Sequence, residues 1–331
     1  MYNDLESVTL RGDFAATVGV VRGPDEEWAD RIDTLLEHKA EIWAWQNSTA
    51  LRHEIDLDAY YYVAHVDGVP FANASIFEKH GVGIFGHVYT QEDRRGLGAA
   101  SLLTAKAIED FATRGGRALG LGTGYDSSAY HIYRRHGFIG TEEGAGQMAC
   151  HVTSRGEFDK SFFDTADPEI VAPGWGEWPL CWPLMEADIP GVVRNVRMSL
   201  FGRSNPEGPM MGMIREHDDA AADRPPTCLV SRQRTSGAVM ALASWCWHRV
   251  WPGTCVVDIF AHPIAWDAAA ELLSKLELPE AERTLAYVDE QTPEKATLLE
   301  RAGFHVGPTL KRRVAVNTAR TRYADVTEYT R

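Results

Sequence analysis

The pattern of apolar and polar positions changes period along the first half of the chain and predicts alternating strands and helices. Residues 9–23 alternate and predict a strand that ends at Gly23-Pro24, and a helical period follows from Glu26 to about Trp45. The other elements expected in this half are three strands within 59–90, a helix over Leu97–Phe111, a strand over 117–124, a helix over Ser127–His136, and a strand or hairpin over 138–152. This order predicts an α/β (α+β) fold with a mixed, mostly antiparallel central sheet flanked by helices.

Turn residues support this division. Asp67-Gly68 is a dipeptide typical of tight hairpins, and Gly81 marks a second turn of this kind. Gly137 is the residue type that ends helices in a left-handed cap, so we expect the helix before it to stop there.

The second half repeats the order of elements. Its pattern predicts a strand near 177–187, a helix from Pro190, strands over 227–233, 238–250 and 255–261, a helix over 266–277, a strand over 284–288, a helix over 292–302 and a last strand over 305–316. The fragments RRHGF (134–138) and ERAGF (300–304) occupy matching places, 166 residues apart. One long, weak repeat indicates a duplicated domain.

Domain limits follow from the segment between the two halves. Residues 154–176 are charged and contain Pro168 and Pro173, which predicts a linker. We therefore expect a first domain over 1–153 and a second over 177–331.

Composition narrows the class of protein. The chain has 331 residues, 44% of them hydrophobic, which is typical of a soluble globular protein, and a net charge of −14, which argues against nucleic-acid binding. The first twenty residues do not resemble a signal peptide, and no apolar run is long enough to span a membrane. Five cysteines without a C-x-x-C spacing indicate reduced thiols, and we expect a cytoplasmic protein without a metal site.

The segment Tyr89–Phe111 places two arginines and two glycines directly before a helix. The first turn of a helix has unpaired N–H groups and partial positive charge, so it can bind an anion. Gly96 and Gly98 would let a ligand approach the main chain, while Arg94 and Arg95 add full positive charge. Such a turn suits a phosphate or a pyrophosphate. Taken alone, it could equally be a loop that only starts a helix.

A second motif changes that balance. Residues 95–100, RGLGAA, fit the Q/R-x-x-G-x-G/A signature of the GNAT acyltransferase superfamily, and Ala129, Tyr133, Gly137 and Phe138 fit its later A-x-x-x-Y-x-x-x-G-F pattern. In this order the two motifs make most of residues 9–152 resemble a GNAT domain. The chain as a whole resembles a tandem member whose second half is degenerate.

The resemblance implies a site for acetyl-CoA or another acyl-CoA. The backbone N–H groups of Gly96–Ala100 would hold the pyrophosphate, Val88–Thr90 would pair with the pantetheine arm, and Tyr133 would protonate the leaving thiolate. The cofactor-binding residues expected on this basis are Val88, Tyr89, Thr90, Arg94, Arg95, Gly96, Leu97, Gly98, Ala99, Ala100, Asp126, Ser128 and Tyr133. The superfamily often has asparagine where this chain has Asp126, so that carboxylate is expected either to turn away from the phosphates or to serve the acceptor amine.

Other candidates have both a chemical and a packing interpretation. His87 and Thr90 are catalytic candidates beside Tyr133, although strand packing also explains them, and His131 lies about 200° from Tyr133 around a helix. Glu41, Trp43 and Trp45 precede the sheet in a region that borders the acceptor site in the superfamily. Trp245 belongs to a stripe on a strand of the second half that could line a pocket or pack.

The corresponding turn of the second half, AHPIAW (261–266), lacks arginine and glycine, and Pro263 has no N–H to donate. We therefore expect no coenzyme A there. The function predicted for the chain is acyl transfer from acyl-CoA to an amine of a small molecule by direct attack. The alternatives are a GNAT-like enzyme that uses an acyl carrier protein thioester, for acyl transfer or decarboxylation, and a non-catalytic acyl-CoA sensor.

Overall fold

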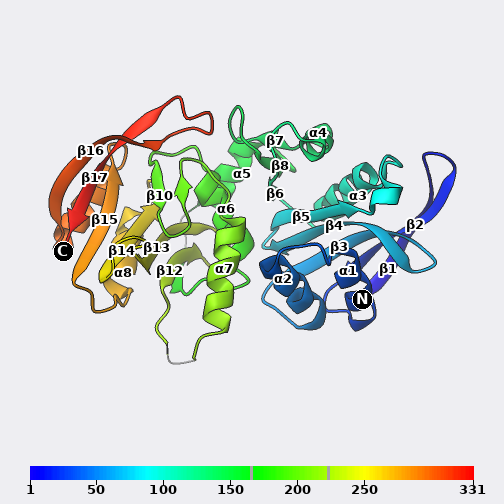
Figure 1. The fold of residues 1–331 in the computed structure, drawn as a ribbon, viewed down its shortest axis with the longest axis horizontal. Coiled ribbons are helices and arrows are strands. Elements are labelled where there is room, and N and C mark those ends of the chain that lie inside the picture. The colour runs from blue at the N-terminus through cyan, green and yellow to red at the C-terminus, as the bar shows by residue number, and fades with distance from the viewer. Residues whose placement is uncertain (165–166, 222–223) are drawn as a thin grey trace. The chain divides into compact units, whose positions relative to one another are not determined.

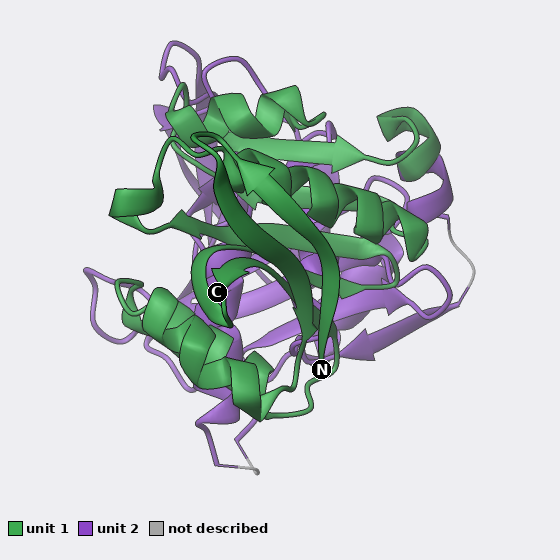
Figure 2. Ribbon diagram, turned by 90° about the vertical axis from the view of Figure 1, so that its right-hand side faces the viewer, with its two compact units in different colours: residues 1–140, 146–158 green, residues 141–145, 159–331 purple. Residues whose placement is uncertain are grey.

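The computed structural model describes residues 1–164, 167–221 and 224–331, and the chain divides into two compact units (Figures 1 and 2). The first unit comprises Met1–Gly140 with Gly146–Phe158, and the second comprises Thr141–Ala145 with Asp159–Arg331. The domain limits at 153 and 177 remain a prediction.

The segment expected to be a linker has structure of its own. It contains helix α5 (Arg155–Phe162) and strand β9 (Pro168–Val171), and β9 pairs antiparallel with β12 (Cys228–Gln233). Pro168 is the first residue of an edge strand, a position where its missing N–H removes no ladder bond. The prolines of this segment therefore do not exclude regular structure.

Within the described residues, the sheet of the first unit runs in the order β1-β2-β3-β4-β5-β6-β8-β7. The strands are β1 (Tyr2–Leu10), β2 (Phe14–Arg22), β3 (Asp58–Val66), β4 (Val69–Lys79), β5 (Val82–Thr90), β6 (Ala118–Gly122), β7 (Ile139–Gly140) and β8 (Gln147–His151). The β5–β6 pair is parallel and all others are antiparallel, which confirms the expected mixed sheet. The predicted strand over 9–23 is wrong in extent, because Gly12-Asp13, with φ of 72° and 57°, turns the chain between β1 and β2.

The helices of the first unit are α1 (Glu26–Leu35), α2 (Glu41–Arg52), α3 (Ala99–Thr113) and α4 (Ser128–Arg135). The single helix expected over 26–45 is broken between α1 and α2, where the ring of His38 packs at a tilt against Tyr89 of β5, with 4.0 Å between the ring centroids. Gly137 has φ 93° and ends α4 as predicted.

The core of the first unit lies between the sheet and the helices α3 and α4. Leu103 and Phe111 of α3 pack there with Tyr62 of β3 and Ile76 of β4, all of them fully buried. Side chains alternate across a strand, so Asn73 and Ser75 of β4 face the opposite side, where α1 contacts the strand. The two faces therefore differ: one is apolar and the other carries buried polar groups.

The second unit has its own sheet, in the order β16-β17-β15-β14-β13-β12-β9 within the described residues. Its remaining strands are β10 (Val193–Asn195), β11 (Leu200–Phe201), β13 (Val239–Trp247), β14 (Thr254–Ala261), β15 (Arg283–Asp289), β16 (His305–Ala315) and β17 (Tyr323–Thr330), and its other helices are α6 (Trp178–Glu186), α7 (Glu207–Asp218), α8 (Trp266–Lys275) and α9 (Pro293–Arg301).

Two predictions for the second half are wrong. The strand expected near 177–187 is helix α6, and the helix expected from Pro190 is replaced by β10, β11 and, later, α7. Every residue of α6 is buried, so its sequence has no polar face and a helical period cannot be recognised in it.

The two units share one order of elements from the parallel strand pair onward. The first has β5-α3-β6-α4-β7-β8 with strand order β5-β6-β8-β7, and the second has β14-α8-β15-α9-β16-β17 with strand order β14-β15-β17-β16. This correspondence agrees with the tandem arrangement that the repeat indicates. In each unit the parallel strands pair over only three residues and then separate.

Candidate functional site

The candidate site of the first unit begins where β5 separates from β6. Their ladder ends at the pair Ile84–Gly120, and the rest of β5 has no β6 partner in the described part of the chain. A cavity of about 550 Å³ lies there, lined by the end of β5, the following turn, the first turn of α3, and α4.

The turn before α3 is shaped by glycine. Gly96 has φ 84° and Gly98 has φ 97°, a left-handed region that residues with a Cβ rarely adopt. A Cβ built on either glycine would meet nothing within 4 Å, so both face open space at the cavity. Gly98 is the N-cap of α3 and has no side chain to satisfy the first N–H groups, which leaves them for a ligand. The turn thus combines an accessible backbone with the positive end of a fifteen-residue helix.

Four arginines line this cavity: Arg11, Arg94, Arg95 and Arg135. Arg94 and Arg95 also lie 3.3 Å from Asp93 and Glu92, exposed acidic neighbours that offset part of their charge. Against a net charge of −14, this local concentration of guanidinium groups is the physical requirement for capturing an anionic ligand. Sequence reasoning missed Arg11, which lies in the β1–β2 turn and whose N–H donates to Leu97 O at 3.2 Å.

A β-bulge interrupts β5 beside the cavity. His87 and Val88 of β5 face the single residue Ala74 of β4, and His87 has φ 49°. Two side chains of β4 take over the hydrogen bonds that the ladder loses: Asn73 Nδ2 donates to His87 O and Ser75 Oγ donates to Gly86 O, both at 3.0 Å. The bulge changes the direction of the backbone before Val88 and Tyr89, which line the cavity.

Tyr133 of α4 lines the same cavity and is 7% exposed. Its ring packs edge-on to Phe85 at 5.6 Å and against Phe138 at 6.0 Å. These contacts restrict the ring, so its hydroxyl has a defined place relative to β5.

Most of the predicted cofactor-binding residues line the cavity. They are Val88, Tyr89, Thr90, Arg94, Arg95, Gly96, Gly98, Ala99, Ala100, Ser128 and Tyr133, and the structure adds Arg11, Ser101, Ala129, Ile132 and Arg135. Leu97 instead packs against the core, and the exposed Asp126 lies 2.9 Å from His131, so neither belongs to the lining. His131 is half exposed, as its place on the helix suggests.

Two catalytic candidates have different surroundings. His87 Nε2 lies 2.8 Å from Gln46 Oε1 and Nδ1 lies 3.4 Å from Asn47 Nδ2, and burial, followed by the charges of Lys39 and His38, lowers the pKa of His87 to about 3. A ring with both nitrogens in contact and so low a pKa is a poor base, which argues against that role. The hydroxyl of Thr90 lies at the cavity, buried and with no hydrogen-bond partner among the residues that the structure describes.

The predicted acceptor residues do not meet at one place. Trp43 packs edge-on to His87 at 5.7 Å, whereas Trp45 lines a separate cavity of about 440 Å³ formed by α1 and α2. Glu41 is exposed at the start of α2. Trp245 packs into the core of the second unit beside Leu273 and Leu278.

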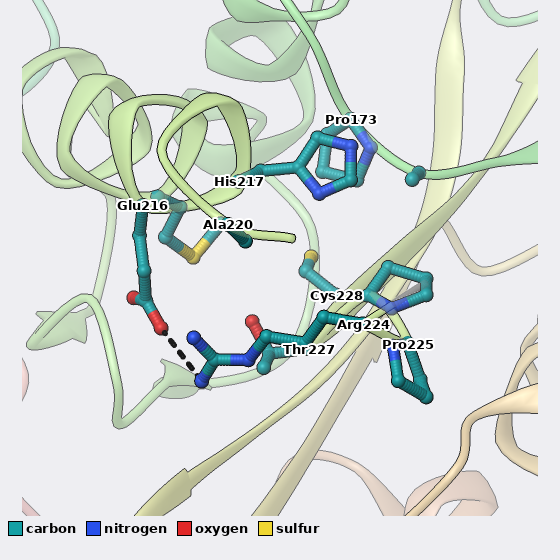
Figure 3. Close-up of a pocket in the computed structure, with 11 residues that line it drawn as sticks. Pro173, Glu216, His217, Ala220, Arg224, Pro225, Thr227 and Cys228 are labelled. Atoms are coloured by element: carbon teal, nitrogen blue, oxygen red, sulfur yellow. Dashed lines mark ion pairs between the residues drawn. The ribbon is translucent and has the colours of Figure 1, made fainter. Parts of the chain in front are cut away.

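A much smaller hollow lies in the second unit (Figure 3). It is lined by α7, including Glu216 and His217, and by Arg224 and Cys228, with Arg224 3.6 Å from Glu216. Its volume is about 20 Å³, room for one water molecule. Burial raises the pKa of Cys228 to about 12, so this sulfur stays a thiol and is no candidate nucleophile.

Comparison with known proteins bears on the first unit. Residues 25–138 match the family described as acetyltransferase (GNAT) family. This region is a GNAT acetyltransferase domain. The match covers about a third of the chain and contains β5, the glycine turn, α3 and α4. No curated protein sequence matches the chain.

Solved structures similar to this chain carry related descriptions. An N-acetyltransferase from Staphylococcus aureus Mu50 is 15% identical, with 50% of this chain and 98% of that one covered at a TM-score of 0.36. A ribosomal-protein-alanine N-acetyltransferase from Brucella melitensis is 16% identical (49% and 98% covered, TM-score 0.37). A GNAT family N-acetyltransferase from Escherichia coli in complex with CoA is 19% identical (42% and 82% covered, TM-score 0.34).

Among the residues described, no helix has the length and apolar character that crossing a membrane requires. In the same residues, His, Cys, Asp and Glu side chains form no group of three or more that could hold a metal ion.

Proposed function

We propose that the GNAT domain of the first unit transfers an acyl group from acyl-CoA to an amine of a small molecule. The observation that carries this proposal is the cavity at the end of β5, where a bare glycine turn, the N-terminus of α3 and four arginines converge. An anion with several phosphates fits this combination, and the adjoining opening between β5 and β6 suits an extended arm that ends in a thioester.

The residues of this chain would divide the work of binding. The N–H groups of the first turn of α3, with Arg95 and Arg135, would hold the diphosphate. The backbone of Val88–Thr90 on the side away from β4, with the unpartnered Thr90 hydroxyl, would pair with the amides of the arm. When bound, the thioester supplies an activated acyl group and a thiolate leaving group.

The bulge of β5 would polarise the acyl carbonyl. An N–H of Val88 or Tyr89 would donate to the carbonyl oxygen as negative charge develops there, an arrangement of the oxyanion-hole type. Asn73 and Ser75 are positioning residues in this proposal, because they hold the carbonyls of His87 and Gly86 and so keep the bulge in place.

Tyr133 would act as the general acid. A phenol has a pKa of about 10 and is therefore protonated at neutral pH, so a positioned tyrosine can donate a hydrogen bond, or its proton, to the departing sulfur and then regain a proton from water. His87 is a poor candidate for taking the amine proton, given its low pKa. We therefore propose that the amine attacks in its neutral form and loses its proton to water.

Release of free thiol from acetyl-CoA in the presence of a panel of primary amines tests the proposal. We expect amine-dependent release that falls about 100-fold in kcat in Tyr133→Phe, while the Kd for acetyl-CoA stays unchanged. Tyr130→Phe is the matched control, because Tyr130 is on the same helix but outside the cavity lining.

Other outcomes would separate the alternatives. Binding of acetyl-CoA without turnover of any amine, unaltered in Tyr133→Phe, would contradict the enzymatic proposal and favour a sensor. Turnover with an acylated carrier protein but not with acetyl-CoA would contradict the proposed donor.

A further inference from the structure

The second unit has an opening that corresponds to the one beside β5. Strands β14 and β15 separate after the pair Val256–Leu285, and β10 contacts both of them. The segment that contains β10, residues 191–197, lies across this opening, as its hydrogen bonds to both strands indicate.

Two buried carboxylates bind the backbone of this segment. Asp289, at the end of β15, accepts hydrogen bonds from the N–H groups of Val192 and Val193 at 2.9 and 2.8 Å. Asp258 of β14 accepts from Val196 and Arg197 at 2.8 and 3.4 Å. Each strand thus holds one end of the segment through charged acceptors, which make stronger hydrogen bonds than neutral ones.

Two buried cationic side chains, one on α9 and one in the segment itself, make further hydrogen bonds here. Lys295 of α9 donates from Nζ to Val193 O at 3.2 Å, and its side chain is 0% exposed. Arg194, 2% exposed, donates to five backbone carbonyls, those of Leu184, Met185, Ala187, Ile189 and Gly191. Ionised groups this deeply buried are costly unless paired, so the segment and its partners stabilise one another.

Equivalent backbone bonds align the two openings. Arg117 N donates to Gly81 O in the first unit, and Glu282 N donates to Gly253 O in the second. These bonds mark the start of each parallel pair.

Asp258 follows Gly253 at the same interval as Gly86 follows Gly81, so Asp258 corresponds to Gly86. Asp289 follows Glu282 at the same interval as Gly124 follows Arg117, so Asp289 corresponds to Gly124. The two positions that hold the segment in the second unit therefore have no side chain in the first. The first opening lacks the anchors for such a segment.

Gly191 lies at a position in this segment that leaves no room for a side chain. It has φ 115°, and a Cβ on it would meet Phe260 of β14 at 2.8 Å and Thr292, the N-cap of α9, at 2.9 Å. The segment enters the opening so closely that only glycine fits between the strand and the helix.

We propose that residues 191–197 are an internal peptide ligand of the second unit, filling the opening between β14 and β15 and leaving the chain with one acyl-CoA site, in the first unit. The prediction of a single acyl-CoA site rests on the proposed function, whereas the proposal of an internal peptide ligand does not. The class of ligand that this opening takes is an extended backbone, read through its N–H groups by two aspartates.

Hydrogen exchange followed by mass spectrometry tests the internal ligand directly. We expect peptides covering 191–197, like those covering the buried neighbouring strand β14, to exchange on the order of 1,000-fold more slowly than an unstructured peptide. Gly191→Ala should lower that protection at least 10-fold. Gly212→Ala is the matched control: Gly212 lies in α7, a Cβ there would meet nothing within 4 Å, and protection should remain unchanged.

Unprotected exchange of 191–197 in the wild-type protein, with β14 still protected, would overturn the internal ligand. So would equal protection in the Gly191→Ala and Gly212→Ala variants. If Gly191→Ala does not fold, Asp289→Asn replaces it, with the same expected loss at Val192 and Val193.

Equilibrium dialysis with acetyl-CoA tests the number of acyl-CoA sites per chain. One molecule per chain is expected, and none should remain in Gly98→Asp. Two molecules per wild-type chain, with one left in Gly98→Asp, would overturn the single site and leave the proposed function standing. One molecule in both proteins would overturn the site in the first unit and count against the proposed function as well. No binding in the wild type would count against the proposed function, and hydrogen exchange would still decide the internal ligand.

Discussion

The two units place the same elements around the same opening and give them different chemistry. Before α3 stand Arg95, Gly96 and Gly98, with left-handed glycines and accessible amides, whereas Ala261–Ala265 stand before α8, with Pro263 among them. Ala265, the N-cap of α8, has φ −124°, an ordinary conformation for a residue with a Cβ. The fold therefore places the same opening in both units, and a few turn residues determine whether amides and positive charge are accessible beside it.

The strands and helices around the opening also differ between the two units. Strands β13 and β14 pair one-to-one from Ala241–Ala261 to Trp247–Cys255, whereas β5 carries a bulge against β4. Leu299, 166 residues after Tyr133, is buried at the corresponding place of α9 and has no hydroxyl. The turn, the bulge and the tyrosine thus occur together in the first unit, as expected if they serve one reaction.

The largest effect is expected from Gly98→Asp, which places a negative charge in the glycine turn before α3. A carboxylate would enter the space where the anion is expected, so binding of acetyl-CoA should weaken at least 100-fold, measured by calorimetry. Gly115→Asp is the matched control. Gly115 also has positive φ (88°) and open space around a built Cβ, but lies beyond α3 and outside the cavity lining.

Both substitutions strain the backbone by about 1–2 kcal/mol, because they place a Cβ on a left-handed residue. A similar loss of thermal stability in both variants, with loss of binding in Gly98→Asp alone, would assign the effect to the ligand site. Equal weakening of binding in both variants would contradict the proposal that the glycine turn before α3 binds the anion.

A smaller effect is expected from Asn73→Ala, which makes the first unit more like the second by weakening the support of the bulge. His87 O would lose the hydrogen bond from Asn73 Nδ2, so kcat should fall about 10-fold, as expected when aligned transition-state donors are displaced. The KM for acetyl-CoA should stay within twofold, since the turn is untouched. Asn73→Asp, which cannot donate, should resemble Asn73→Ala, and Asn73→Gln should recover part of kcat. A rise in KM with constant kcat would instead indicate a binding role.

Local signals in the sequence were sufficient for much of this site. The glycine turn could be predicted because glycines and arginines stand directly before a helical period, and Tyr133 because it falls on a pattern that resembles the GNAT superfamily. Most of the strands and helices of 58–151 followed from period and turn residues for the same reason.

The remaining features depend on contacts distant in sequence. Arg11 reaches the cavity only because the β1–β2 turn bonds to Leu97, and the bulge at His87 depends on the register against β4. The segment 191–197 has no motif, and the aspartates that bind it lie more than sixty residues further along the chain. Pairing register and long-range hydrogen bonds leave no period in the sequence, so pattern analysis could not find them.

The smallest effect concerns His87, whose counterpart in the second unit, counted from Gly81 and Gly253, is the apolar Ile259. In the folded chain burial lowers the pKa of His87 to about 3, while in the unfolded chain it stays near 6.5. The unfolded state therefore binds more protons between these values, so stability is full above pH 6.5 and is lost as the pH falls toward 3. We expect about 1.6 kcal/mol of this loss between pH 6.5 and 5, and His87→Gln should remove it. Urea unfolding at both pH values, with hydrogen exchange of β5 and β14 read separately, measures it. An equal pH response in the wild type and His87→Gln would contradict a neutral, buried His87, and a change confined to β5 would locate the effect in the first unit.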